Sequence, residues 1–229
     1  MDIDAIRGSI KSTIRSHSRA FKQVGDSLSK LLELGAITGM AAHYRSLGCD
    51  VTAVNPRGGS SFVVKTSTRG HPWNFSKFIV THKGKTFELH MNLMVKGAHD
   101  EGVYCVDIGV TQPGKVPTRK SETKWHCLEN RHLISFAEVK KLNIYPMLLA
   151  QFIGIVHEIM PQFLRRKRKP NKPHLPPTLI VLGQFSGNSR AIVNEYNRRE
   201  VCVLIAENYD MRLARARRDD RSAFIADRQ

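Results

Sequence analysis

The first part of the chain carries apolar residues at helical spacing. Isoleucines recur at steps of three or four residues from Ile3 to Ile14, and apolar positions at these steps, or at their sum, continue beyond them. This periodicity predicts one long helix or two helices over residues 3–34, with a break allowed at Gly25. A further short helix is predicted over residues 38–46 and ends before a glycine.

Alternation with a period of two follows. Residues 75–95 read FSKFIVTHKGKTFELHMNLMV, and Lys83-Gly84-Lys85 at the centre predicts a β-hairpin. Polar side chains alternate with apolar ones over residues 86–93, which predicts a strand with one dry face and one solvated polar face. Further strands are predicted over residues 102–111 and about 133–140. The polar stretch between them is long for a simple connection, and such loops are often functional.

The second half alternates between helices and strands. Pro146 suits the first turn of a helix that continues to about residue 160. A strand at 178–185, a helix at 188–200 and a strand at 201–209 then complete the chain's regular elements. This order predicts an α/β fold with a central mixed sheet and helices on both faces.

Three regions are predicted from these patterns. We expect an N-terminal helical region at residues 1–48, with the first core helix near residues 31–47. The α/β core is expected over residues 49–209. The last segment, 210–229, is charged and predicted to be a helical tail.

The charge of the chain points to a polyanionic partner. Thirty-six basic residues outnumber twenty acidic ones, for a net charge of +16, and nucleic acid is the first expectation. The five consecutive cations of one proline-rich loop would then contact backbone phosphates, although such a run is often only solvated. These cations are Arg165, Arg166, Lys167, Arg168 and Lys169.

Several compartments and partners are disfavoured. No stretch of about 18 uninterrupted apolar residues is present, so a membrane span is not expected. The N-terminus lacks the apolar core of a secretion signal. Four cysteines occur without a CxxC pair, which favours a reducing, cytoplasmic setting over a disulfide framework.

Two predicted strands carry acids where apolar residues are expected. Asp107 lies between Val106 and Ile108, and Glu138 shares one face of the next strand with Lys140. If the two strands are neighbours, the two carboxylates can converge. They would then repel each other unless a cation lies between them, and Mg²⁺ typically takes one or two carboxylates.

These residues resemble the PD-(D/E)xK nuclease superfamily. Asp107, followed after an insert by Glu138-Val139-Lys140 and a helix, is similar to the motif of that family over about residues 86–205. The resemblance implies a restriction-endonuclease-like fold. It implies that Asp107 and Glu138 bind Mg²⁺ or Mn²⁺, that the Val139 carbonyl is a further ligand, and that Lys140 is catalytic. Some members add a glutamine on the following helix, for which Gln151 is the candidate.

Accessory residues are also suggested. Some members of the superfamily contribute an acid from the first helix, and Glu33 is the candidate here. Glu88 and His90 lie on the polar face of a neighbouring strand, where they could contact the metal or a phosphate. The alternative for these two side chains is a solvated sheet face, and Glu138 and Lys140 could be a solvated ion pair.

The sequence thus predicts a metal-dependent DNA endonuclease acting in restriction, phage defence or repair, as a homodimer or within a multi-protein complex. Two alternatives stay open. A catalytically inactive module of the same fold would bind nucleic acid without cleaving it. A protein adaptor would use the N-terminal helix and the Arg-rich tail to hold a partner protein.

Overall fold

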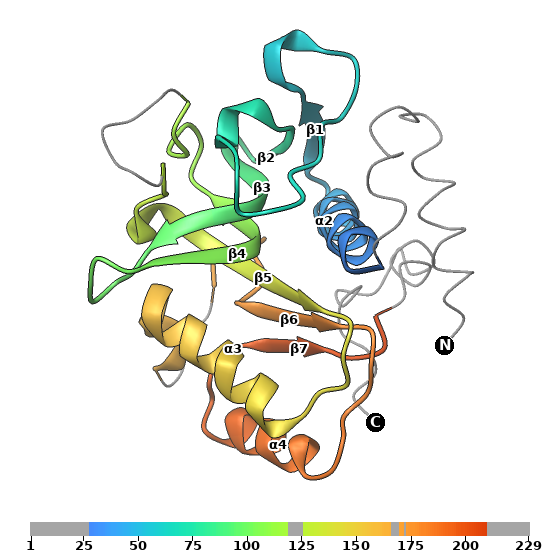
Figure 1. Cartoon of the computed structure of the whole chain (residues 1–229), viewed down its shortest axis with the longest axis vertical. Helices are drawn as coiled ribbons and strands as arrows, with labels where there is room; N and C mark the ends of the chain where they lie inside the picture. The colour runs from blue at the N-terminus through green and yellow to red at the C-terminus, as the bar shows by residue number, and fades with distance from the viewer. Residues whose placement is uncertain (1–27, 119–125, 166–169, 172, 210–229) are drawn as a thin grey trace.

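The computed structural model describes residues 28–118, 126–165, 170–171 and 173–209. These residues form an α/β fold with a central mixed sheet, as predicted, and the sheet has seven strands (Figure 1). Residues 3–27 of the helix predicted over 3–34, and the predicted tail over 210–229, lie outside the described residues. None of the described helices is both long enough and apolar enough to cross a lipid bilayer.

The strands follow one another across the sheet in chain order. They are β1 (Asp50–Val54), β2 (Lys77–His82), β3 (Lys85–Lys96), β4 (Val103–Thr111), β5 (Leu133–Lys140), β6 (Thr178–Val181) and β7 (Leu204–Ala206). Strands β1 to β5 pair antiparallel, whereas β5, β6 and β7 pair parallel. The parallel pairs require crossover connections, and helices supply them.

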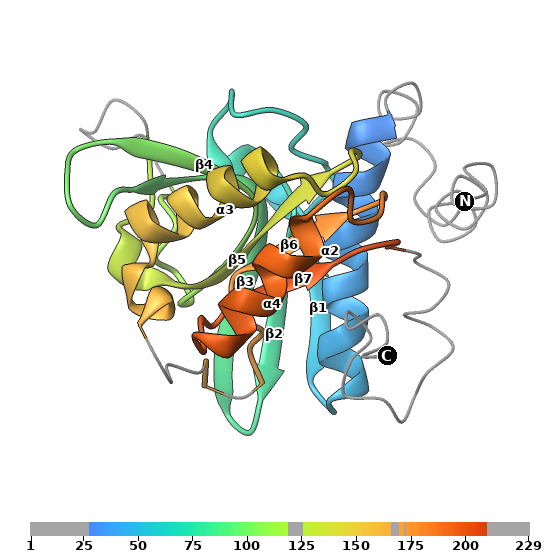
Figure 2. The ribbon, with the colours of Figure 1, turned by 90° about the horizontal axis from the view of Figure 1, so that it is seen from below.

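Helices cover both faces of the sheet, which gives two hydrophobic cores. Helix α2 (Leu28–Ser46) packs on one face, and α3 (Pro146–Ile159) and α4 (Ser189–Arg198) lie on the other (Figure 2). A sheet that is buried on both faces needs apolar side chains at successive positions, and β6 is buried throughout.

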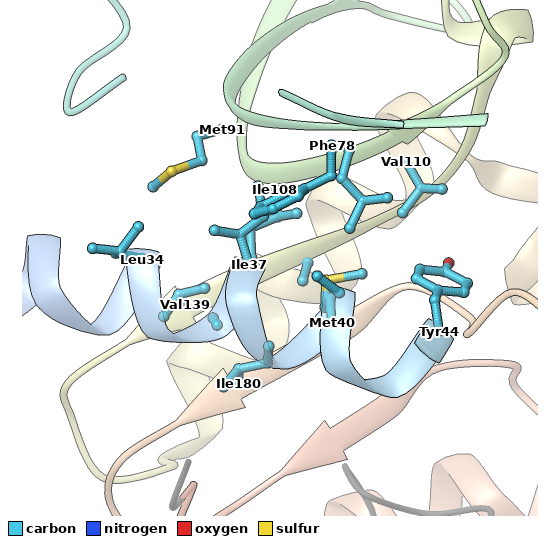
Figure 3. Packing of buried hydrophobic residues seen from close by; sticks show 14 of the residues in the cluster. Leu34, Ile37, Met40, Tyr44, Phe78, Met91, Ile108, Val110, Val139 and Ile180 are labelled. Carbon is cyan, nitrogen blue, oxygen red and sulfur yellow. The ribbon is translucent and has the colours of Figure 1, made fainter. Parts of the chain in front are cut away.

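Helix α2 presents a continuous apolar stripe to the sheet. Leu34, Ile37 and Met40 recur at steps of three and point toward the strands, where Ile108 and Ile180 meet them (Figure 3). All five side chains are at most 2% exposed. The stripe therefore fixes α2 across the central strands, including the two that carry Asp107 and Glu138.

The predicted hairpin is confirmed. Strands β2 and β3 are joined by Lys83 and Gly84, whose φ angles are 48° and 74°. Two consecutive residues with positive φ are typical of a type I′ turn, whose twist matches that of the flanking strands.

Some predicted boundaries are wrong. Helix α2 runs without interruption from Leu28 to Ser46, where the pattern predicted one helix ending near residue 34 and another starting at Thr38. Gly35 and Gly39 stay helical because packing against the sheet outweighs their low helix propensity. Strand β1 was not predicted. Strands β6 and β7 are also shorter than the predicted 178–185 and 201–209.

Candidate active site

The candidate site lies where strands β4 and β5 separate. Their pairing ends at Ile108 and Ala137. Beyond that pair, Asp107 Oδ2 accepts a hydrogen bond of 2.7 Å from the backbone N–H of Val139. The Asp107 carboxylate thus takes the place of a ladder carbonyl and fixes its own position between the two strands.

Lys140 joins both acids. Its Nζ lies 3.2 Å from Asp107 Oδ2 and 2.7 Å from Glu138 Oε2. The two carboxylate oxygens are therefore no farther apart than the sum of these distances. The structure thus brings Asp107, Glu138 and Lys140 into one cluster, with Glu138 and Lys140 on one face of β5 as the alternation predicted.

Glu138 is in an unfavourable environment for a charged group. It is 4% exposed, and its Oε1 has no hydrogen-bond partner among the described residues. Burial, and then the charge of Asp107, raise the pKa of Glu138 to about 7, although Lys140 opposes both. A buried carboxylate oxygen without a partner is expensive, so this position is suited to a cation that would complete its coordination.

Lys140 keeps its proton. Burial alone would lower the pKa of its ammonium group, but the two carboxylates outweigh burial and raise it above the ordinary value. The group is therefore an ammonium at neutral pH. It supplies positive charge and hydrogen-bond donors at the mouth of the site, since its side chain is 35% exposed.

A cleft of about 370 Å³ opens over this cluster. Glu138 and Lys140 line it together with Gln151, which is exposed on α3. One face of α3 forms the wall, and Glu158 lines it seven residues farther on. Tyr104 lines the end of the cleft near Glu158, and its hydroxyl donates a hydrogen bond of 3.4 Å to Glu158.

Glu33 is held inside the protein, not solvated. It is 7% exposed, and its Oε2 accepts a hydrogen bond of 2.9 Å from Asn92 Nδ2. Lys30 lies 3.1 Å from the other oxygen. The same Asn92 Nδ2 also donates to the carbonyl of Lys65, and the Lys65 ammonium donates back to the carbonyl of Asn92.

This network adjoins the Asp107 cluster. Asn92 belongs to β3 at the register position opposite Asp107 on β4, because the flanking pairs are Met91–Ile108 and Leu93–Val106. The charges of Glu33 and of the Asp107 cluster both act on the Cys105 thiol. Burial, and to a lesser degree Asp107, Glu138 and Glu33, raise its pKa to about 12, whereas Lys65 opposes them.

Asn92 also reverses the faces of β3. Its φ is 47°, in the left-handed region. Met91 before it belongs to the core under α2, whereas Leu93 after it belongs to the core under α3. A single alternation therefore does not extend through this strand, and the predicted uniform dry and polar faces are wrong at this point.

The expectation that Glu88 and His90 form a solvated face is wrong as well. They are 4% and 7% exposed. Glu88 accepts hydrogen bonds from Lys77 at 2.7 Å and from the Gly114 N–H at 3.2 Å, and its Oε2 lies 2.9 Å from His90 Nε2. Burial opposes the charged form of Glu88, but the partners His90 and Lys77 outweigh it and lower its pKa to about 2.

The donor set can be compared with the needs of a divalent cation. Within the part of the chain that the structure describes, no three His, Cys, Asp or Glu side chains gather into a metal site. Mg²⁺ usually keeps several waters and takes only one or two carboxylates from a protein, which Asp107 and Glu138 could supply. The N–H and carbonyl of one strand residue point to the same side, so the Val139 carbonyl also faces β4.

The basic loop is only partly described. Arg165 is exposed just after a short 3₁₀ turn at Pro161–Leu164. Residues 166–169 lie outside the described residues, so the structure does not place the other four predicted phosphate contacts.

Sequence reasoning missed Lys65 and Asn92, because an isolated lysine in a polar loop and an asparagine in an alternating strand carry no distinctive signal.

Comparisons with protein-family models, with curated proteins and with solved structures found no match for this chain.

Proposed function

We propose that this protein is a metal-dependent endonuclease of the PD-(D/E)xK class that hydrolyses phosphodiester bonds in DNA. The proposal rests on the cluster in which Asp107, Glu138 and Lys140 meet where β4 and β5 separate. Helix α2 is followed by the five antiparallel strands β1–β5, helix α3 and the parallel strand β6. The part of this order from β3 to β6 supports a restriction-endonuclease-like core.

The carboxylates would hold the metal ion. Asp107, Glu138 and the Val139 carbonyl would bind Mg²⁺ or Mn²⁺. Glu138 Oε1, which has no hydrogen-bond partner among the described residues, is the oxygen that would gain most from a cation. When bound, such an ion lowers the pKa of a coordinated water and offsets charge on the phosphate. Asp107 stays oriented throughout, because the Val139 N–H holds one of its oxygens.

Lys140 would act on the developing charge. As an ammonium group with a raised pKa, it is a hydrogen-bond donor and not a base in the free protein. It can stabilise negative charge on the phosphate oxygens in the transition state. Gln151 lines the same cleft and would hydrogen-bond a water or a phosphate oxygen.

The rest of the chain would supply the DNA-binding surface. A net charge of +16 favours a polyanion, and the cations 165–169 are the proposed backbone contacts. We further propose that the protein acts in the cytoplasm in restriction, defence against phage or repair, as a homodimer or in a larger complex, because cutting both strands of a duplex requires two sites.

The test is the conversion of supercoiled plasmid to nicked and linear forms, with Mg²⁺ and with EDTA. Lys140→Ala should abolish the Mg²⁺-dependent conversion. Lys141→Ala, which removes an exposed lysine from the next position, should retain it. Undiminished conversion by Lys140→Ala, or conversion in EDTA, would contradict the proposal.

The same preparation separates the alternative functions. Retention of DNA in a gel-shift assay that weakens with salt, but without nicking, would indicate a binding module with an inactive site. Absence of any affinity for DNA at low salt would favour a protein adaptor.

A further inference from the structure

A second cavity lies away from the candidate active site. It encloses about 160 Å³ between the end of β1, residues 72–77, His90 and residues 116–118. It shares no lining residue with the cleft over Glu138. Its volume is below the range typical of drug-sized ligands, so it suits one small ring system.

Aromatic rings form part of the wall and are held in place. Trp73 and Phe75 line the cavity. His71 stacks on Trp73 with ring centroids 4.5 Å apart and planes 3° apart, and His126 meets Trp73 edge-on at 5.2 Å. Gly70 allows this arrangement, because a Cβ at that position would lie 2.9 Å from the Phe75 ring.

His90 supplies a hydrogen-bond acceptor to the wall, which Asn55, Lys77 and Thr118 also line. Because Glu88 is ionised, the 2.9 Å contact requires that His90 Nε2 carries the hydrogen and donates it. Burial lowers the pKa of His90, so the ring is neutral and its Nδ1 is an acceptor. Nδ1 has no partner among the residues that the structure describes. A planar group with an N–H donor would satisfy it.

The charge around the cavity favours an anionic ligand. Residues 55–77 and 112–118, which supply most of the wall, contain five lysines or arginines and no aspartate or glutamate. Lys77 is paired with Glu88 and Lys65 is buried, which leaves three exposed cations, Arg57, Arg69 and Lys115. Arg57 directly follows a lining proline, and Lys115 directly precedes Val116; both are exposed. A flat ring attached to a phosphate chain matches this combination of aromatic wall, acceptor and exposed cations.

We propose that this cavity binds a single unstacked nucleobase of a nucleic-acid strand, which stacks on Trp73 and donates a hydrogen bond to His90. The inference rests on the nucleic-acid substrate proposed above and adds how part of it is recognised. His90 precedes Asn92 by two residues on β3, so the cavity and the acidic cluster lie at neighbouring registers of one strand pair. Taking a base out of a duplex costs free energy, least where the base is already unpaired.

The experiment compares two short duplexes of the same sequence, one fully paired and one with a single unpaired adenine. Binding to the full-length protein is measured by fluorescence polarisation in EDTA at fixed salt, so that cleavage does not interfere. The wild-type protein should bind the duplex with the unpaired base more tightly. Trp73→Ala should reduce this preference by roughly five- to a hundredfold, the usual contribution of stacking one base, and leave affinity for the paired duplex unchanged.

Two further variants keep the result interpretable. Trp73→Phe retains an aromatic face and should keep most of the preference. Tyr145→Ala removes an exposed aromatic side chain outside the cavity and should leave it intact. An unchanged preference in Trp73→Ala, alongside normal metal-dependent cleavage, would overturn this inference alone. Absence of nucleic-acid binding by the wild-type protein would overturn the proposed substrate together with it.

Discussion

Replacing Glu138 by glutamine should make the metal-free protein more stable. The pKa of Glu138 rises from 4.5 to about 7 on folding, so the folded state binds this proton more tightly than the unfolded state. The free energy of unfolding therefore falls as pH rises from about 4.5 to about 7, and the whole decrease is present above about pH 7. At roughly 1.4 kcal/mol per unit, this interval corresponds to about 3 kcal/mol.

Glutamine removes that penalty with little change of shape. It leaves the contact of 3.2 Å between Lys140 and Asp107, so the ammonium group keeps a partner. At a pH above the pKa of Glu138, Glu138→Gln should raise the free energy of unfolding by up to about 3 kcal/mol. Near pH 4.5 the two proteins should be equally stable. Urea unfolding of both proteins in EDTA across this pH range would measure it.

The opposite result is expected if Glu138 serves as a structural ion-pair partner of Lys140. Breaking a stabilising buried pair would lower stability, and the decrease would grow with pH. Such a decrease would contradict the prediction. Glu195→Gln is the matched control, because Glu195 pairs with Arg198 on the surface of α4 and its pKa is lowered by that hydrogen bond. This variant should be slightly less stable than the wild-type protein.

Three other predictions concern the site, the basic loop and the packing behind them. Asp107→Asn should abolish Mg²⁺-dependent nicking and retain DNA binding in a gel shift, since it removes a negative charge near the phosphates; loss of both would indicate a structural role. Alanine at all five positions 165–169 should weaken binding evenly across sequences and reduce the salt slope by about 0.9 for each phosphate that the loop neutralises; an unchanged slope would place the loop off the DNA. Gly183→Ala should destabilise the fold by roughly 1–3 kcal/mol in urea unfolding, because its Cβ would lie 2.6 Å from the carbonyl oxygen of Leu142; a neutral effect would show that this loop yields easily.

Much of the fold follows from local patterns. The turn at Lys83-Gly84, the strand around Asp107, the strand around Glu138 and the helix from Pro146 each carry a strong sequence signal. The meeting of Asp107 with Glu138 could be predicted too, because consecutive strands usually pair and alternation gives the face.

The rest depends on contacts that sequence patterns do not carry. The reversal at Asn92 comes from a single left-handed residue, which the alternation around it hides. Glu88 and His90 look like exposed strand residues, but Lys77 and the Gly114 N–H contact Glu88, and His90 lines a cavity together with Trp73 and Val116. A loop has no periodicity, so the position at which it folds back over a sheet is fixed only by tertiary packing.

Whether Asp107 and Glu138 hold one metal ion is tested most directly by Mn²⁺ binding, measured by calorimetry at a pH well above the pKa of Glu138. We predict that the wild-type protein binds the ion, that Asp107→Asn and Glu138→Gln each abolish this binding, and that Glu195→Gln retains it. Equal Mn²⁺ affinity in the wild-type protein and in Glu138→Gln would contradict the proposed metal site.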